Sequence, residues 1–96
     1  MEKTCKIIKL ETDMLQLSRK GLEDKLQQIK NEGFERIGID LKEQPSLNSM
    51  AIGILAYNYV VLHDLGAELF LVNPSMRVMK VLESTGLVKV IKIEYT

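Results

Sequence analysis

The sequence has 96 residues, of which 46% are hydrophobic and 27% are charged, and its 13 basic side chains are balanced by 13 acidic ones. This length and composition predict one globular domain over residues 1–96 and exclude a disordered chain. Residues 1–44 hold nine basic and nine acidic side chains, and residues 45–96 hold four of each. Because no clustered basic surface is expected, we predict no nucleic-acid partner and no polybasic membrane anchor.

Residues that bind metals or perform catalysis are scarce. The single cysteine, Cys5, excludes an internal disulfide and a cysteine-rich zinc site, and the single histidine, His63, excludes a site with two histidines. His63 lies close to Asp64 and Glu68 in the sequence, but its position on a helix flank predicts a packed side chain rather than a catalytic one. We therefore expect no metal, no cofactor and no enzymatic activity.

Residues 44–63 carry no formally charged side chain. Their most apolar part, residues 50–62, is shorter than the roughly 20 residues that a helix needs to cross a bilayer. We interpret this stretch as a buried or partner-facing helix. The first ten residues contain Glu2 and three lysines, which is unlike the apolar segment of a secretory signal. We therefore expect a cytoplasmic protein without membrane insertion.

Strands and helices are predicted to alternate along the chain. Residues 6–10 form a first strand, and residues 14–17 are a candidate for a second, short one. A helix over residues 18–32 follows, because Leu22, Leu26 and Ile29 recur at helical spacing. Gly33 is suited to end this helix in a left-handed conformation.

The second half repeats the alternation. Residues 37–41 form a strand, and an apolar helix runs from Asn48 and Ser49 to about residue 66. Residues 68–72 read as a strand that is covered on both faces, because four apolar residues follow one another. A third helix begins at residues 73–75, with Pro74 in its first turn, and residues 88–93 form the last strand. The pattern predicts an α/β fold with a mainly parallel or mixed sheet of four to five strands, about three to four helices, and the N-terminal strand at an edge.

The apolar helix has two apolar sides. Successive residues turn by about 100°, which places Ile52, Leu55, Tyr59 and Leu62 toward the sheet. The opposite side is also apolar, with Gly53 on its flank, and consists of Met50, Ile54, Tyr57 and Val61. Either a crowded core covers this opposite side or a partner protein binds it.

Ser49 lies where this helix begins, next to Asn48. A serine or asparagine at this position commonly caps the helix and stabilises it by about 1 kcal/mol. A phosphate on Ser49 would also be tolerated, because the helix dipole favours anions at the N-terminus. Sequence chemistry leaves both interpretations open.

Three segments carry a resemblance to the STAS domain of bacterial anti-sigma factor antagonists. The first is Ile-Gly-Ile-Asp-Leu at residues 37–41, and the second is Leu-Asn-Ser-Met-Ala-Ile-Gly-Ile-Leu at residues 47–55. The third combines residues 66–72, Gly-Ala-Glu-Leu-Phe-Leu-Val, with residues 81–87, Val-Leu-Glu-Ser-Thr-Gly-Leu. The spacing between the segments also resembles that of the family.

The resemblance implies a non-enzymatic protein-binding module in a partner switch. Such an antagonist binds a serine kinase that is also an anti-sigma factor, the kinase phosphorylates a serine at the start of a helix, and a phosphatase reverses the modification. Ser49 matches this serine, and Asn48 matches the acidic residue that precedes it. Together with the outer apolar side of the helix, this predicts partner binding by Asn48, Met50, Gly53, Ile54, Tyr57 and Val61.

The resemblance leaves alternatives open. Asn48, Met50 and Ala51 stand where the family has Asp, a second Ser and Gly. A constitutive STAS scaffold or transport-accessory subunit without a phosphorylation switch is the second hypothesis, and a small-ligand sensor or enzyme is the third. We expect a monomer or a weak homodimer.

Overall fold

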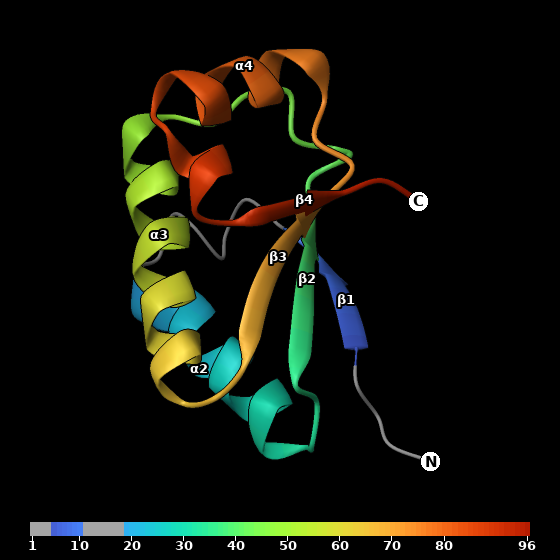
Figure 1. The fold of residues 1–96 in the computed structure, drawn as a ribbon, viewed down its shortest axis with the longest axis vertical. Coiled ribbons are helices and arrows are strands. Elements are labelled where there is room, and N and C mark those ends of the chain that lie inside the picture. The colour runs from blue at the N-terminus through green and yellow to red at the C-terminus, as the bar shows by residue number, and fades with distance from the viewer. Residues whose placement is uncertain (1–4, 11–18) are drawn as a thin grey trace.

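The structure is a computed structural model that describes residues 5–10 and 19–96. Strands and helices alternate along it (Figure 1). In chain order they are β1 (Cys5–Lys9), α2 (Arg19–Asn31), β2 (Arg36–Asp40), α3 (Ser49–Asp64), β3 (Glu68–Val72), α4 (Met76–Ser84), a 3-10 turn η1 (Leu87–Lys89) and β4 (Lys92–Glu94).

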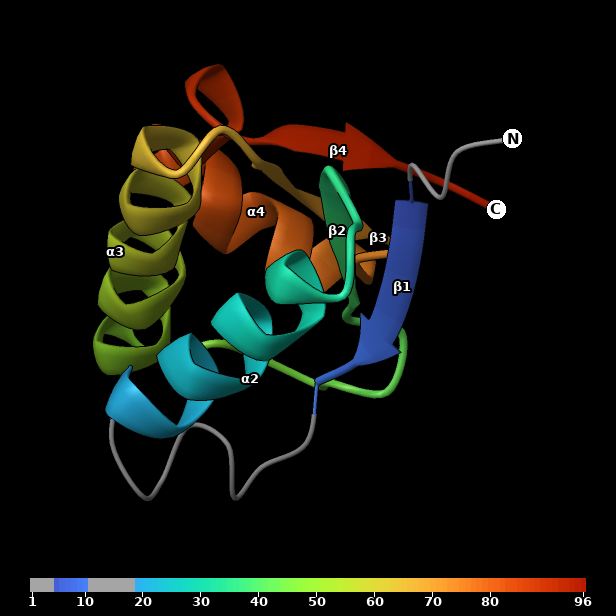
Figure 2. The same cartoon turned by 90° about the horizontal axis from the view of Figure 1, so that it is seen from below.

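The four strands form one sheet in the order β1-β2-β3-β4, and every neighbouring pair is parallel. The order in space is therefore the order in the chain. Right-handed crossovers that always step in the same direction place every connecting helix on the same side of a sheet. Figure 2 shows this result, because the three described α-helices, α2, α3 and α4, all lie on one side of the sheet.

The main core lies between the sheet and the helices. Ile37 and Ile39 of β2 and Leu69 and Leu71 of β3 point toward the helices and are 0% exposed. The helices contribute apolar residues at helical spacing. These are Leu22, Leu26 and Ile29 from α2, Leu55 and Leu62 from α3, and Val78 and Leu82 from α4.

The helix-free side of the sheet also has buried residues. Phe70 and Val72 of β3 point to this side and are each 1% exposed. The prediction that residues 68–72 are buried on both faces is thus confirmed, although a helix covers only one face. The guanidinium of Arg36 lies 4.3 Å from the centre of the Phe70 ring. Gly38, next to Phe70 in the register, leaves room for the ring, since a Cβ built there would lie 2.6 Å from Phe70 Cζ.

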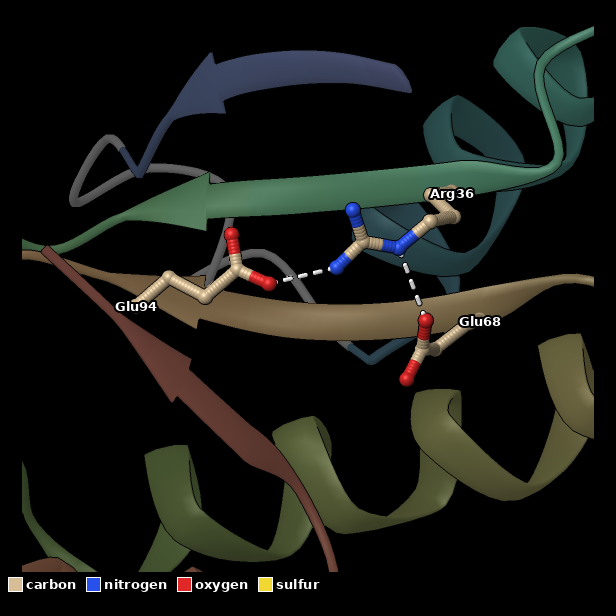
Figure 3. A network of polar contacts seen from close by, with 3 residues as sticks. All are labelled: Arg36, Glu68 and Glu94. Carbon is tan, nitrogen blue, oxygen red and sulfur yellow. Dashed lines mark hydrogen bonds and ion pairs between the residues drawn. The ribbon is translucent and has the colours of Figure 1, made fainter. Parts of the chain in front are cut away.

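Arg36 also connects three strands (Figure 3). Its Nε donates to Glu68 Oε1 of β3 at 2.8 Å, and its Nη2 donates to Glu94 Oε2 of β4 at 2.5 Å. The hydrogen bonds to Glu68 and Glu94 raise the pKa of Arg36 above its ordinary value. The guanidinium therefore stays charged over Phe70 at every pH that the fold experiences.

The predicted fold class is confirmed: the described chain is α/β with four parallel strands and three α-helices, and β1 lies at the edge of the sheet. The candidate strand at residues 14–17 lies outside the described residues. No helix in the part of the chain that the structure describes is both long and apolar enough to cross a membrane.

Two predicted boundaries are wrong. The last strand was expected over residues 88–93, but Gly86 has φ 78° and is followed by η1, whose turn closes through Ile91 N–H donating to Leu87 O at 2.9 Å. Leu87 and Ile91 are buried at the two ends of this turn, which leaves only three residues for β4. Pro74 precedes α4 rather than entering its first turn, because Ser75 is the N-cap and accepts from Val78 N–H at 3.2 Å.

Candidate functional site

The loop between β2 and α3 is held by defined contacts at the carboxyl end of the sheet. Leu41 N–H donates to Val72 O at 2.8 Å, and the side chain of Gln44 donates to Leu10 O at 3.1 Å. Leu47, directly before the helix, is 6% exposed and packs in the core. The position at which α3 begins is therefore fixed from both sides.

Asn48 is the N-cap of α3. Its Oδ1 accepts from Ala51 N–H at 2.8 Å, and its backbone is extended with φ −92° and ψ 176°. Ser49 is thus the first residue inside the helix, and it is exposed. Asn48 therefore caps the helix, and the side chain of Ser49 is not the cap. In α4, by contrast, the serine itself is the cap.

The orientation of α3 differs from the expected one. The helix contacts both β3 and α2, so its buried side is wide and includes Ala51, Ile52, Ile54, Leu55, Asn58 and Leu62. Ile54 is only 6% exposed and belongs to the core, so its expected place on the partner-facing side is wrong. Tyr59, expected in the core, is only partly buried.

The solvent-facing side is centred on Gly53 and Val60, which lie about 20° apart on the helical wheel. We define the outer face of α3 as the exposed residues Met50, Gly53 and Val60 with the half-buried Tyr57 and Val61 at its borders. Met50 and Val60 are 57% and 55% exposed. Val60 was missed from the sequence, although its position beside Gly53 on the wheel was available as a signal.

The structure leaves room for a side chain at Gly53. A Cβ built on it meets nothing within 4 Å. A glycine inside a helix destabilises it by about 0.5–1 kcal/mol relative to alanine. Gly53 therefore lowers the stability of the helix, and no close contact within the described chain requires a glycine there.

His63 lies on the surface of the molecule and not in the core. Its side chain is 71% exposed, which contradicts the packed position that its place on the helix predicted. Glu68, its neighbour in the sequence, binds Arg36 instead. Within residues 5–10 and 19–96 no group of three metal-ligating side chains is present.

A hollow of about 330 Å³ lies at the opposite end of α3 from Ser49 and is lined by Lys30, Gly33, Phe34, Glu35, Leu65 and Gly66.

Comparisons with known proteins give one family and one fold. The STAS domain family model matches residues 2–96, and no curated protein sequence matches the chain. The NMR structure of the protein TM1081 is similar with a TM-score of 0.78 and 24% identity, over 96% of this chain and 74% of that one. The crystal structure of TM1081 from Thermotoga maritima, named as a candidate anti-sigma factor antagonist, gives a TM-score of 0.75 and 24% identity, over 94% and 80% of the two chains.

Proposed function

Because the chain belongs to the STAS domain family, we propose that it is a regulatory protein-binding module of the anti-sigma factor antagonist type. It binds a serine kinase that is also an anti-sigma factor, and phosphorylation of Ser49 ends this binding until a phosphatase removes the phosphate. The protein performs no catalysis of its own and acts in the cytoplasm. A solved structure of similar fold carries the name of a candidate anti-sigma factor antagonist.

The observation that supports the proposal most directly is that Asn48, and not Ser49, caps α3. Asn48 caps α3, so the hydroxyl of Ser49 is not needed for the helix and is exposed to a kinase. A phosphate in the first helical turn is favoured by the helix dipole and by the unpaired N–H groups there. Phosphorylation would thus change the charge beside the outer face while the fold is preserved.

The outer face of α3 supplies the docking surface in this proposal. Met50 and Val60 expose apolar area, and Gly53 allows a partner's backbone to approach closely. Exposed apolar patches of this kind are typical of protein-binding sites. Asn48 and the half-buried Tyr57 and Val61 complete the surface.

Met50 favours a second candidate function. This large side chain, 57% exposed, stands directly after Ser49, where it narrows the approach of a kinase active site. A protein that kept the docking surface but escaped phosphorylation would be a constitutive scaffold or transport-accessory subunit. The same surface would then bind its partner without control by Ser49.

The test is the affinity for the partner protein, purified by capture on the parent chain, together with intact-mass analysis after incubation with that partner and ATP. We expect one phosphate on Ser49, and we expect Ser49→Asp to bind at least about tenfold more weakly than Ser49→Ala, or roughly 1.4 kcal/mol. Ser84→Asp, which adds the same charge at the far end of α4, is the matched control and should bind normally. If no phosphate appears and Ser49→Asp binds normally, the scaffold function replaces the switch.

A matched pair on α3 tests the surface itself. Val60→Asp should abolish binding with little change in melting temperature, since Val60 is exposed. Ile54→Asp should unfold the protein, since it buries an unpaired charge. Normal binding by the Val60→Asp variant would exclude the outer face as the docking surface.

A further inference from the structure

The turns that follow α2 and α3 meet at the edge of the sheet where the strands begin. Gly33 follows α2 with φ 106°, and Gly66 follows α3 with φ 86°. Because β2 and β3 are parallel neighbours, the two turns lie side by side, and Glu68 N–H donates to Glu35 O at 2.8 Å. Figure 1 shows both helix ends at the lower end of the molecule, from which β2 and β3 start. The topology therefore brings two helix C-termini to one place.

The hollow described above lies between these two turns. Its volume of about 330 Å³ is at the lower end of the range of small-molecule pockets, roughly 300–1,000 Å³. Gly33 and Gly66 leave it open, because a Cβ built on either residue would meet nothing within 4 Å. Phe34 and Leu65 supply the apolar part of its lining, and Leu65 is 45% exposed. The hollow thus has the size and one apolar wall for a small molecule.

Two opposite charges line the same hollow, the half-buried Lys30 and the exposed Glu35. No ion pair joins their side chains, and neither side chain has an ion pair or a hydrogen bond with any other residue that the structure describes. A charge in a hollow is attracted to a counter-charge more strongly than in bulk water, because the effective dielectric constant near a protein is lower. The hollow therefore offers a ligand an ammonium group and a carboxylate that no described residue occupies.

The helix ends give the hollow a positive part and a negative part. A helix C-terminus carries roughly half a negative charge. Lys30 lies in the last turn of α2 and offsets the charge there. The last turn of α3 contains neither lysine nor arginine. Glu35 and the end of α3 therefore make one part of the lining negative, and Lys30 makes another part positive.

We propose that this hollow binds a small apolar α-amino acid in its zwitterionic form. The ligand's carboxylate accepts from Lys30 Nζ, its ammonium group donates to the carboxylate of Glu35, and its side chain packs on Phe34 and Leu65. Hydrogen bonds between charged groups are about twice as strong as those between neutral groups. An amine or a carboxylic acid would pair with only one of the two charges. An amino acid pairs with both.

The ligand test is an NMR titration of the purified, ¹⁵N-labelled chain with L-leucine. Two analogues with the same apolar group are the controls: 3-methylbutylamine lacks the carboxylate, and 4-methylpentanoate lacks the ammonium group. We expect L-leucine to bind with a Kd below about 1 mM and to shift the amide signals of Gly33 and Gly66. Each analogue should bind at least about tenfold more weakly.

Two results of this titration overturn the proposal. The first is the absence of shifts at the two glycine amides with L-leucine, L-valine, L-methionine and L-phenylalanine at up to about 10 mM each. The second is equal binding of L-leucine and either analogue, which would show a site for a single charge. The titration contains no partner protein, so its failure leaves the function proposed above untouched.

Charge-removing variants test the two contacts separately. Lys30→Gln and Glu35→Gln should each bind L-leucine at least about tenfold more weakly. Lys30→Gln should bind 3-methylbutylamine as the parent does, and Glu35→Gln should bind 4-methylpentanoate as the parent does. Lys25→Gln and Glu83→Gln remove exposed charges outside the hollow and are the matched controls. Neither Lys30 nor Glu35 is buried, so circular dichroism should be unchanged. Parent-like binding of L-leucine by either hollow variant would overturn the proposal.

Discussion

Asn58 is a polar side chain at the centre of the buried side of α3. It is 1% exposed, its Nδ2 donates to Ile54 O at 2.9 Å, and its Oδ1 has no hydrogen-bond donor. A buried acceptor without a donor costs about 1–3 kcal/mol. The Ile54 carbonyl also accepts the usual helical N–H, so loss of the Asn58 amide would leave no backbone group without a partner.

We therefore predict that Asn58→Leu stabilises the protein by about 1 kcal/mol in urea unfolding, since it removes the buried oxygen that has no donor and replaces the amide with apolar groups without changing the number of side-chain heavy atoms. Asn58→Asp is the contrasting variant and should be strongly destabilising, because it buries a charge. A loss of stability in Asn58→Leu would show that a buried water satisfies Oδ1.

At the scale of elements, α3 is the helix on which sequence and structure differ most. Its existence and both its ends follow from the sequence, because Asn48 caps the start and Gly66, with φ 86°, ends it. The rotation of α3 about its own axis cannot be predicted from the sequence, because nearly all its residues are apolar and the helical wheel has no clear polar side. Contact with α2 as well as β3 decides the rotation and buries Ile54.

The bounds of a strand were predicted best where its own sequence shows that it is buried. The strand Glu68–Val72 matches the predicted range, since a continuous apolar run is typical of a strand that is buried on both faces of a parallel sheet. The last strand was predicted to begin four residues too early, at residue 88 instead of Lys92, since Val88 and Val90 look β-prone but follow the turn at Gly86. At the candidate site, the exposure of Ser49 depends on whether Asn48 or Ser49 caps the helix. The sequence could not decide this, because asparagine and serine are both common N-caps.

Gly53 gives a prediction for α3 as an element. Gly53→Ala should stabilise the protein by about 0.5–1 kcal/mol, because the added methyl meets nothing within 4 Å and alanine favours the helix. The same variant should bind the partner more weakly, because the methyl projects from the outer face. Urea unfolding and calorimetric titration of one preparation check both effects. A variant that is more stable and binds equally well would show that Gly53 does not contact the partner.

At the scale of the whole molecule, the unusual property is a parallel sheet whose described helices all lie on one side. Parallel sheets are normally covered on both faces. Here Arg36 replaces the missing layer above Phe70, with Glu68 and Glu94 holding its guanidinium. The folded-state pKa of Arg36 is raised, so its contribution to stability is complete below the unfolded pKa and is lost only when the pH rises through the folded value, in strongly alkaline solution.

Arg36→Ala should lower the free energy of unfolding by about 1–3 kcal/mol, the sum of two half-exposed ion pairs and a cation–π contact. It should also increase the binding of an apolar fluorescent dye, because Phe70 loses its cover. Arg36→Lys keeps a charge but not the planar group, so its effects should be intermediate. Because the pKa is raised, the difference between parent and Arg36→Ala should be the same at pH 6 and pH 9. Unchanged dye binding in Arg36→Ala would show that another group covers the ring.

The agreement between strand order and chain order has a consequence for synthesis on the ribosome. Each of β2, β3 and β4 pairs with the described strand that precedes it in the chain, so none of these strands has to wait for a later one. The sheet can grow by one helix and one strand at a time as the chain emerges, and domains commonly begin to fold during synthesis. During this growth β2 and β3 are each at the edge of the sheet only until the next strand pairs with them. Among the described strands β4 is made last, and its length of three residues leaves little edge with which another chain could pair.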